Sequence, residues 1–410
     1  MPQPKDIYAF LFINEYGGVK MVENYTKLGI YDNILQTIGK TPLVRLRKIE
    51  RYFNLKNELY AKVEFFNPGG SVKDRIGKYM IEGAKEEGKI VQGAVIIEPT
   101  SGNTGVGLAL VAAVEGYMTV FTMPDKMSTE KELLLKAMGA FVIRTPTAVA
   151  PGDPNSYYKV AEAVRNLIWK KGRAVTREEL KEIVEHVQRL VNEERLDELK
   201  AILEEEVEET PYAYIPNQYF NRYNPLAHYE TTAREIWEQT GGEIDYLFAG
   251  IGTGGTITGI GRYLKERKKD VKIIGVDPVG SIYSLVKKGM SLEEALKKAH
   301  PYLVEGIGED LLPETVDLSL VDDMVVVNDQ QAFSMTRFLA RKEGILAGGS
   351  SGAALYGAVK YLKEKGVEGK KVVVIFPDTG RNYLTKVFND EWLIANGFEV
   401  DDEKVLEVLR

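Results

Sequence analysis

Short β-branched runs alternate along the chain with stretches of helical periodicity, and glycines mark the junctions between them. The runs that we expect to form strands are AVIIE from residue 94, MTVFTMP from residue 118, FVIRTP from residue 141, DYLFAG from residue 245, VKIIGVDP from residue 271, DMVVV from residue 323 and VVVIFPD from residue 372. This alternation predicts an α/β fold whose mostly parallel sheet is covered by helices on both faces. Ligands of such folds bind at the carboxyl ends of the strands.

A highly charged segment, residues 176–209, departs from this rhythm and contains neither Gly nor Pro. Its apolar residues recur at helical spacing and are Leu180, Ile183, Val184, Val187, Leu190 and Val191. We therefore expect a helical hairpin with one apolar face. It is either an inserted surface element or, alternatively, a subunit contact or an active-site lid.

Composition narrows the classes of function. The net charge of −7 is spread over both signs, so no basic stripe is available to bind nucleic acid or an anionic membrane. The chain contains no cysteine, which excludes disulfides and thiolate metal sites and fits a cytoplasmic protein. No ligand cluster surrounds His186, His228 or His300, so we expect no metal. The apolar stretch near the N-terminus is too short and wrongly flanked for a secretory signal.

The segment FFNPGGSVKDRIGKYMIEGAKEEGK, residues 65–89, predicts a helix with a lysine in its first turn. Ser71 and Asp74 have the spacing of a capping box. The inward-facing residues are expected to be Val72, Ile76, Met80 and Ala84. Lys73 at this position meets positive backbone dipoles, which would lower its basicity as a Schiff-base lysine requires. The alternative is a surface lysine that reaches into solvent.

Three polar loops each open a predicted helix. EPTSGNTG, residues 98–105, groups donors suited to a carboxylate on Thr100, Ser101, Asn103 and Thr104. GTGGTITG, residues 252–259, is suited to a phosphate monoester because its glycines allow close approach of backbone N–H groups. In AGGSSG, residues 347–352, Ser350 or Ser351 could hydrogen-bond a pyridine nitrogen, although both could equally be plain helix caps.

Taken together, these motifs resemble the fold type II pyridoxal-phosphate-dependent enzymes, in the branch of cystathionine β-synthases and cysteine synthases. IGKTPLVRL, TMPDKMSTEK, NPLAHYETT and PDTGRNY complete the pattern, which covers residues 31–398. The resemblance implies a tryptophan synthase β-like fold of two interleaved lobes with twisted sheets. The expected parts are an N-terminal arm at 1–30, a larger cofactor-binding lobe at 45–66 and 211–398, a smaller mobile lobe at 67–168, a helical insertion at 169–210 and a tail at 399–410.

The resemblance also implies roles for individual residues. Lys73 would bind pyridoxal 5′-phosphate covalently and later move the substrate's α-proton. Asn103 would contact the ring hydroxyl, and Ser350 becomes the partner of the ring nitrogen. The phosphate would be held by Gly252, Thr253, Gly254, Gly255 and Thr256. The substrate carboxylate would be bound by Thr100, Ser101, Thr104 and Gln218.

Tyr219, with Gly280 and Ser281 as further substrate-binding candidates, favours the cystathionine β-synthase branch, because a phenol could help to activate a poor leaving group. We therefore expect β-replacement on serine with homocysteine. The alternatives are a cysteine synthase that uses O-acetylserine or O-phosphoserine with sulfide, a dehydratase, and a catalytically idle regulatory homologue; Tyr219 could also be a core aromatic. The resemblance suggests a homodimer. Because the chain ends at Arg410 and lacks cysteine, we expect neither tandem regulatory domains nor a thiolate-ligated haem.

Overall fold

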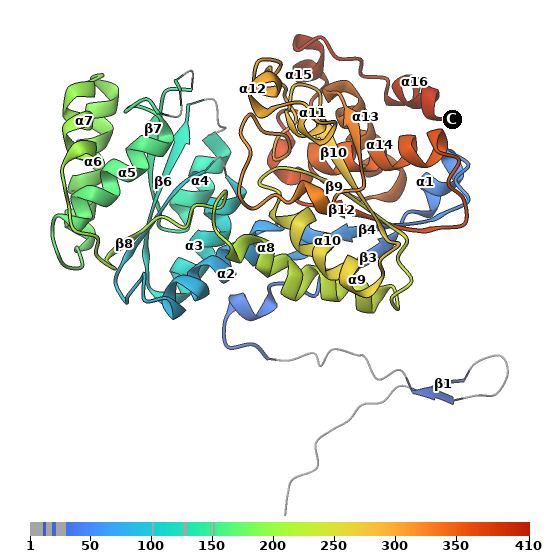
Figure 1. Cartoon of the computed structure of the whole chain (residues 1–410), viewed down its shortest axis with the longest axis horizontal. Coiled ribbons are helices and arrows are strands. Elements are labelled where there is room, and N and C mark those ends of the chain that lie inside the picture. The colour runs from blue at the N-terminus through green and yellow to red at the C-terminus, as the bar shows by residue number, and fades with distance from the viewer. Residues whose placement is uncertain are drawn as a thin grey trace, which may run out of the picture.

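The computed structural model describes residues 30–410 apart from 101, 126–128, 148 and 151, and two short strands nearer the N-terminus. These strands, β1 (Leu11–Ile13) and β2 (Val19–Met21), pair antiparallel. The rest of the expected N-terminal arm lies outside the described residues. Two larger sheets organise the chain (Figure 1), and we call the parts built on them the large lobe and the small lobe.

The sheet of the large lobe has six strands in the order β11-β10-β9-β12-β4-β3. All neighbours run parallel except the edge pair β3–β4, which is antiparallel. The strands are β3 (Leu43–Arg45), β4 (Glu58–Val63), β9 (Tyr246–Gly250), β10 (Lys272–Pro278), β11 (Asp323–Val327) and β12 (Lys371–Phe376). The four runs predicted in the second half of the chain are therefore confirmed as strands.

The sheet of the small lobe has four parallel strands in the order β7-β6-β5-β8. They are β5 (Val95–Pro99), β6 (Met118–Pro124), β7 (Phe141–Thr145) and β8 (Ala213–Tyr214). The first three confirm predicted strands. The expected start of the larger lobe at residue 211 needs a correction, because β8 pairs with β5 before the chain enters the large lobe.

Helices cover both faces of both sheets (Figure 1), as the strand pattern predicted. Those of the small lobe are α2 (Lys73–Glu86), α3 (Asn103–Glu115), α4 (Thr129–Ala137), α5 (Tyr157–Trp169), α6 (Arg177–Asn192) and α7 (Leu196–Glu204). Those of the large lobe are α1 (Arg47–Tyr52), α8 (Tyr223–Ala227), α9 (Ala233–Gln239), α10 (Gly255–Arg267), α11 (Tyr283–Lys287), α12 (Leu292–Leu296), α13 (Asp329–Glu343), α14 (Gly349–Glu364), α15 (Asp390–Ala395) and α16 (Asp402–Leu406).

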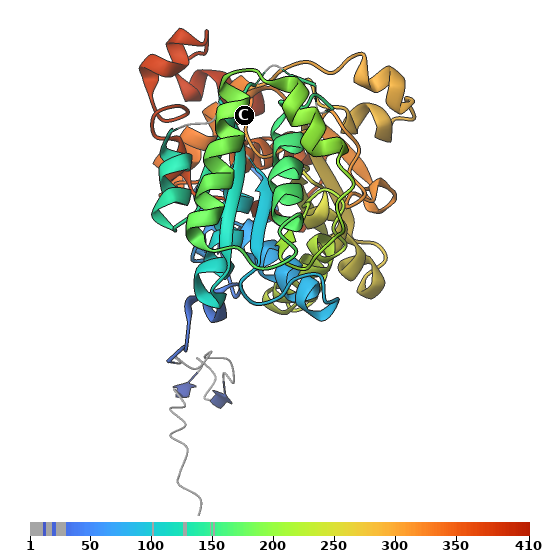
Figure 2. The ribbon, with the colours of Figure 1, turned by 90° about the vertical axis from the view of Figure 1, so that its left-hand side faces the viewer.

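The charged segment at 176–209 forms the expected helical hairpin, α6 and α7, on the outside of the small lobe (Figure 2). A capping box of Thr176 and Glu179 starts α6. The residues predicted for its apolar face are all buried, against α5 and β7: Leu180, Ile183, Val184, Val187, Leu190 and Val191. The hairpin therefore extends the core of the small lobe.

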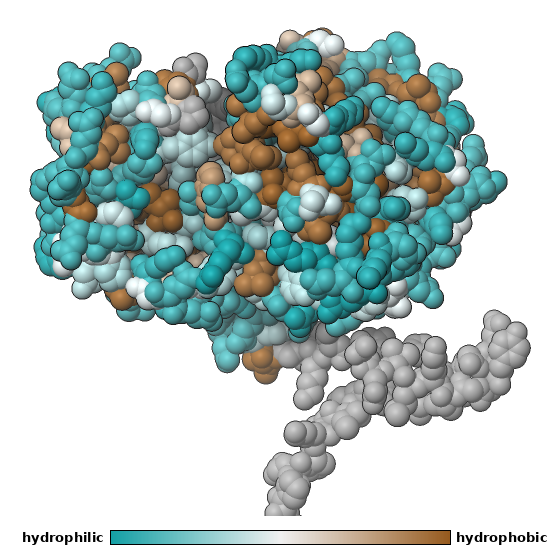
Figure 3. All heavy atoms as spheres, viewed as in Figure 1, coloured by the Kyte–Doolittle hydropathy of each residue, from teal (hydrophilic) through white to brown (hydrophobic). Residues whose placement is uncertain are grey.

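The surface of the large lobe carries hydrophobic side chains beside α11 and α12 (Figure 3). The exposed apolar residues of this stretch are Val279, Leu292, Leu296, Leu303 and Leu312. None of the helices in the described residues has the length and apolar character that crossing a bilayer demands.

Candidate active site

Three loops that are distant in sequence meet where α2 begins. Val72 N donates a hydrogen bond to Pro377 O at 2.8 Å, so the segment before α2 pairs with the segment after β12. Gly348 N, at the start of α14, donates to Asp378 O at 3.0 Å. These backbone bonds place Lys73, Asp378 and the serine-rich turn together at the carboxyl end of β12, where ligands of such sheets bind.

The start of α2 differs from the predicted capping box. The helix begins at Lys73, as expected for its first turn, but its N-cap is Val72, which offers no side-chain cap. Ser71 Oγ accepts from Lys73 N at 3.1 Å, whereas Asp74 Oδ2 accepts from Gly69 N at 2.5 Å. The bridge between Ser71 and the segment after β12 holds the serine in extended backbone, so the helix starts one residue later than a capping box would set it.

Lys73 is half-buried, and its Nζ makes no hydrogen bond or ion pair with any residue that the structure describes. Desolvation lowers the pKa of this amine to about 8, although the charges of Glu309 and Asp378 oppose the shift. An amine with such a pKa is partly neutral near physiological pH and can attack a carbonyl or transfer a proton.

Close packing of α2 on α3 fixes the position of Lys73. A Cβ on Gly107 would lie 2.6 Å from Lys73 O, and a Cβ on Gly77 would lie 2.6 Å from the carbonyl carbon of Gly107. Only glycine permits this approach at both positions. The crossing brings the start of α3, with its polar loop, beside the lysine.

The loop after β5 presents the predicted carboxylate-binding donors. Thr100 Oγ1 accepts from Gly102 N at 3.2 Å, and Thr104 Oγ1 donates to Gln218 Oε1 at 2.7 Å. The structure thus brings Thr104 and Gln218 together from positions far apart in the chain. Ser101, the fourth candidate of this group, lies outside the described residues.

Glu98, at the end of β5, was not identified from the sequence. It is buried, and its carboxylate accepts from Asn217 N at 2.8 Å and from Gln218 N at 3.0 Å. Burial raises the pKa of Glu98 to about 7, against the effect of these two hydrogen bonds. The residue therefore holds the backbone of Asn217 and Gln218 beside the loop. The available signal in the sequence was a single acid near the end of an otherwise apolar strand.

Asn103 is oriented by Asp378. Its Nδ2 donates to Asp378 Oδ2 at 2.9 Å, and Tyr383 OH donates to the same oxygen at 2.6 Å. Asp378 Oδ1 is buried without a hydrogen-bond partner among the described residues, and burial raises the pKa of this carboxyl. One buried acid therefore holds Asn103 by a hydrogen bond and acts electrostatically on Lys73.

The glycine loop at 252–256 leads into α10, as predicted. Gly254 has a φ of +85°, in the left-handed region, and caps the helix. Thr253 Oγ1 accepts from Asn224 Nδ2 at 3.0 Å, which anchors the loop on α8. Backbone N–H groups at the N-terminus of this helix of 13 residues are suited to a phosphate.

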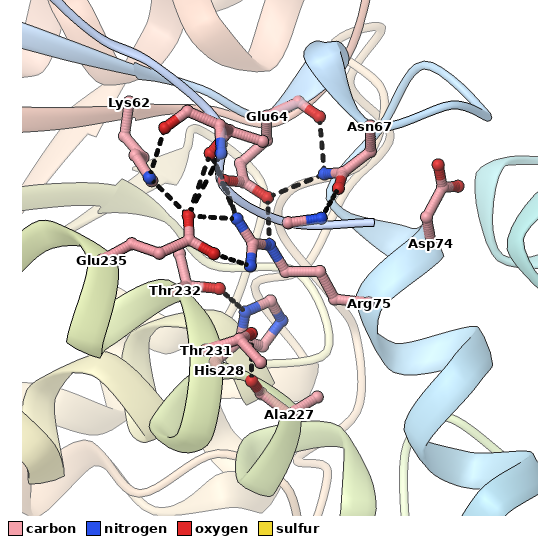
Figure 4. Close-up of polar contacts among 12 residues, drawn as sticks. Lys62, Glu64, Asn67, Asp74, Arg75, Ala227, His228, Thr231, Thr232 and Glu235 are labelled. Carbon is pink, nitrogen blue, oxygen red and sulfur yellow. Dashed lines mark hydrogen bonds and ion pairs between the residues drawn. The ribbon is translucent and has the colours of Figure 1, made fainter. Parts of the chain in front are cut away.

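His228 contacts the glycine loop through Thr256. Its Nε2 lies 3.2 Å from Thr256 Oγ1. Its Nδ1 lies 2.9 Å from Thr232 Oγ1 in a π-helical turn (His228–Thr232), a contact that Figure 4 shows. Burial, followed by the charge of Arg75, lowers the pKa of this imidazole to about 3, so the ring is neutral. Within the described ranges no group of three or more His, Cys, Asp or Glu side chains is arranged to hold a metal ion.

A buried ionic network attaches α2 to the large lobe (Figure 4). The guanidinium of Arg75 contacts Glu64 at 2.7 Å and Glu235 at 2.7 Å, and Lys62 Nζ contacts Glu235 at 2.6 Å. Burial raises the pKa of Glu235, but Arg75 and then Lys62 outweigh it and lower the pKa to about 2. The network links the first turn of α2 to β4 and α9.

The serine candidates of the fourth motif lie in the first turn of α14. Both are buried, with Ser350 3% and Ser351 0% exposed. Ser351 Oγ has no hydrogen-bond partner among the described residues. Neither serine is the N-cap, which is Gly348, so the assignment of Ser350 to the ring nitrogen stays a prediction.

Tyr219 faces a carboxylate that sequence analysis missed. Its OH donates to Glu309 Oε1 at 3.2 Å, and burial raises its pKa well above the usual value. Ser281 Oγ accepts from Glu309 N at 3.0 Å, and Gly280 has a φ of +106° in the same turn. The two residues predicted to bind substrate therefore shape the loop that carries Glu309, and a substrate contact stays a prediction for both.

Comparison with known proteins finds close relatives. The chain is 43% identical to a cystathionine β-synthase of Apis mellifera over 375 residues, which cover 92% of this chain and 64% of that protein. A cystathionine β-synthase of Mus musculus is 44% identical over 92% of this chain and 58% of its own length. The chain thus spans about three fifths of the length of these curated relatives.

A solved structure, of a hydrogen sulfide-producing enzyme from Fusobacterium nucleatum, is similar with a TM-score of 0.67 and 36% identity. It covers 86% of this chain and 98% of that one. Residues 34–378 match the family described as "Pyridoxal-phosphate dependent enzyme", and these findings together confirm the resemblance, the fold class and the cofactor predicted from the motifs. The chain belongs to the pyridoxal-phosphate dependent enzyme family.

Proposed function

We propose that this protein catalyses β-replacement on serine with homocysteine as the acceptor, the reaction of a cystathionine β-synthase. The similarity to cystathionine β-synthases over 92% of the chain supports this activity. The observation that carries it is the site of Lys73, a desolvated amine without a hydrogen-bond partner among the described residues, where the segments before α2, after β12 and at the start of α14 meet.

The described residues fit pyridoxal phosphate. Lys73 would bind its aldehyde, the loop at 252–256 its phosphate, and Ser350 and Asn103 its ring nitrogen and hydroxyl. In support, the buried Ser351 Oγ next to Ser350 has no hydrogen-bond partner in the part of the chain that the structure describes, and the phosphate loop has the left-handed Gly254 at a helix N-terminus. When bound, the cofactor stabilises negative charge at the substrate's α-carbon.

The residues of the chain would position the substrate and move its protons. Thr100, Thr104 and Gln218, with Ser101, would bind the substrate carboxylate near the start of α3. Lys73 Nζ would accept the α-proton, a task suited to a pKa of about 8. Tyr219 would assist the departure of the serine hydroxyl, because its phenol remains protonated.

A cysteine synthase activity is the second candidate, with O-acetylserine or O-phosphoserine as donor and sulfide as acceptor. The similarity to a hydrogen sulfide-producing enzyme motivates this candidate, because a site that releases sulfide from a β-carbon can also bind it for the reverse addition. A regulatory homologue without activity is the third. The filled lysine and phosphate-loop positions argue against it.

We also propose a cytoplasmic homodimer with the lobe boundaries expected from the motifs, the start of the large lobe being moved past β8. The absence of cysteine supports a reducing compartment. The exposed apolar side chains beside α11 and α12 are compatible with a subunit contact.

Steady-state assays test the function. Serine, O-acetylserine and O-phosphoserine are each supplied with homocysteine or sulfide, and thioether, cysteine and pyruvate are measured. We expect serine and homocysteine to give the highest kcat/KM, and Lys73→Ala to abolish turnover and the visible absorbance of the bound cofactor. Lys78→Ala, in the same helix, is the matched control. A cofactor-bound wild type without turnover would support the regulatory homologue, and pyruvate without thioether would indicate a dehydratase.

A further inference from the structure

Glu309 is held at the edge of the candidate site by contacts on both its backbone and its side chain. Its N–H donates to Ser281 Oγ at 3.0 Å, and its carbonyl accepts from Ile282 N at 3.1 Å. Tyr219 OH donates to Oε1 at 3.2 Å, whereas Oε2 makes no hydrogen bond to a residue that the structure describes. The side chain is half-buried, so one carboxyl oxygen is fixed and the other is available to a ligand.

Two carboxyl groups act electrostatically on Lys73, and they differ in what surrounds them. Asp378 is buried, and its Oδ2 already accepts from Asn103 and Tyr383. Glu309 instead keeps a free oxygen and faces phenols. Of these two acids, only Glu309 has the access needed to exchange a proton with a substrate.

The surroundings of Glu309 allow its carboxyl group to be either protonated or ionised near neutral pH. The ionisable groups facing it are Lys73 from α2, Tyr157 and Tyr158 from α5, Tyr219 from the loop before α8, Tyr283 from α11, and Tyr302 and Asp310 from its own loop. Burial, with a smaller contribution from Asp310, raises the pKa of Glu309 to about 7, against Tyr219 and Lys73. Such a carboxyl can donate and accept a proton near neutral pH.

We propose that Glu309 is the acid–base residue for the β-substituent, an inference that rests on the proposed function. As the Cβ–O bond of serine breaks, the carboxyl proton of Glu309 passes to the hydroxyl oxygen, and water leaves. As the Cβ–S bond forms, the carboxylate takes the proton of the incoming thiol, so the carboxyl group is restored. Lys73 serves the α-proton in both half-reactions. Tyr219 assists the departure of the hydroxyl indirectly, because its OH donates to Glu309 and so positions that carboxyl.

This role predicts a difference between donors. Hydroxide is a poor leaving group and needs the proton, whereas acetate leaves without one. Glu309→Gln should therefore lower kcat/KM for serine by roughly 10²- to 10⁴-fold, the usual effect of losing a general acid. With O-acetylserine and the same thiol, the loss should stay below about tenfold, because only the deprotonation of the thiol is affected.

Two matched variants and two further measurements complete the test. Glu309→Asp should restore part of the serine activity, and Asp310→Asn, which removes an acid next to it, should retain the activity but move the pH profile to lower pH. In cofactor-free protein, the infrared difference between wild type and Glu309→Gln should contain a protonated-carboxyl band that titrates near a pH of about 7; the contribution of Glu98, which has a similar pKa, is common to both proteins and cancels. Thermal melting of each variant reports folding.

The outcomes are distinct. Serine turnover that survives Glu309→Gln, or an equal loss with both donors, would overturn the role of Glu309 and leave the proposed function standing. Wild-type protein that converts neither donor would overturn the proposed function, and with it this role. A serine-selective loss with the matching carboxyl titration supports both.

Discussion

Arg75→Met tests the buried ionic network that attaches α2 to the large lobe, because Arg75 contacts both of its carboxylates. The guanidinium donates from Nε to Glu64 at 2.7 Å and from Nη1 to Glu235 at 2.7 Å, and Nη2 adds bonds to Glu64, Glu235 and Thr41. The side chains of Arg75 and Glu64 are 1% and 0% exposed. Methionine keeps much of the volume but leaves Glu64 buried with only Thr41 and Asn67 as side-chain donors among the described residues.

Removal of one partner from such a pair destabilises by about 3–5 kcal/mol, because the remaining charge stays buried without compensation. The effect should depend on pH. In wild type the pKa of Glu64 is lowered, since Arg75 outweighs burial, so its stabilising contribution is present above the unfolded pKa and is lost in acid. In the variant, burial should raise this pKa, and the loss of stability should grow as the pH rises from about 4 to about 8.

Urea unfolding of cofactor-free protein at several pH values measures this difference. Lys85→Met in the same helix is the matched control, because its amine contacts Glu115 at 2.8 Å on the surface, and it should change stability by less than about 1 kcal/mol. Adding Glu64→Leu to Arg75→Met should recover part of the loss. If Arg75→Met destabilised no more than Lys85→Met, or equally at all pH values, the reasoning would be refuted.

Two further changes test the setting of Lys73. Lys73→Met should stabilise the cofactor-free protein below a pH of about 8, by up to roughly 3 kcal/mol, because the folded-state pKa of about 8 lies below the ordinary value of 10.5. The gain should vanish above that ordinary value. An unchanged or lower urea midpoint near neutral pH would contradict this prediction. Gly107→Ala should destabilise the fold by about 1–3 kcal/mol and weaken retention of the cofactor, because the new Cβ would lie 2.6 Å from the backbone of Lys73. The control is Gly152→Ala, which has open space around it and should change neither urea unfolding nor cofactor absorbance. Equal behaviour of the two variants would exclude the steric argument.

The elements whose signals are local could be predicted from the sequence. The strand runs and the apolar face of α6 were correct because side-chain periodicity directly reflects which face is buried. The capping box at Ser71 was wrong because a bridge to Asp378, some 300 residues away, competes for the same backbone. β8 was assigned to the wrong lobe because two residues show no period of their own.

The residues of the candidate site also divide into those with a local sequence signal and those defined only by long-range contacts. Glycine-rich turns at helix starts can be located from spacing, so the sequence alone was enough to identify Lys73, Asn103 and the phosphate loop as candidates. Glu309 could not be identified in this way, because an acid after a glycine turn has no defined role until Tyr219, 90 residues earlier, is placed against it. Glu98 was missed for a related reason, since its partners come from the segment 217–219.

Lys73 and Arg75 show why position in space decides what position in sequence cannot. Two cationic side chains in one turn of α2 have pKa values shifted in opposite directions. Burial disfavours the charge of both, but Arg75 points to two carboxylates within 2.7 Å and remains charged, whereas Lys73 has no carboxylate at hydrogen-bond distance among the described residues and becomes a weaker base. The first turn of α2 thus supplies a structural cation, Arg75, to the large lobe and a reactive amine, Lys73, to the site. Because both residues belong to one helical turn, the ionic network that holds Arg75 also sets the orientation of the turn that carries Lys73.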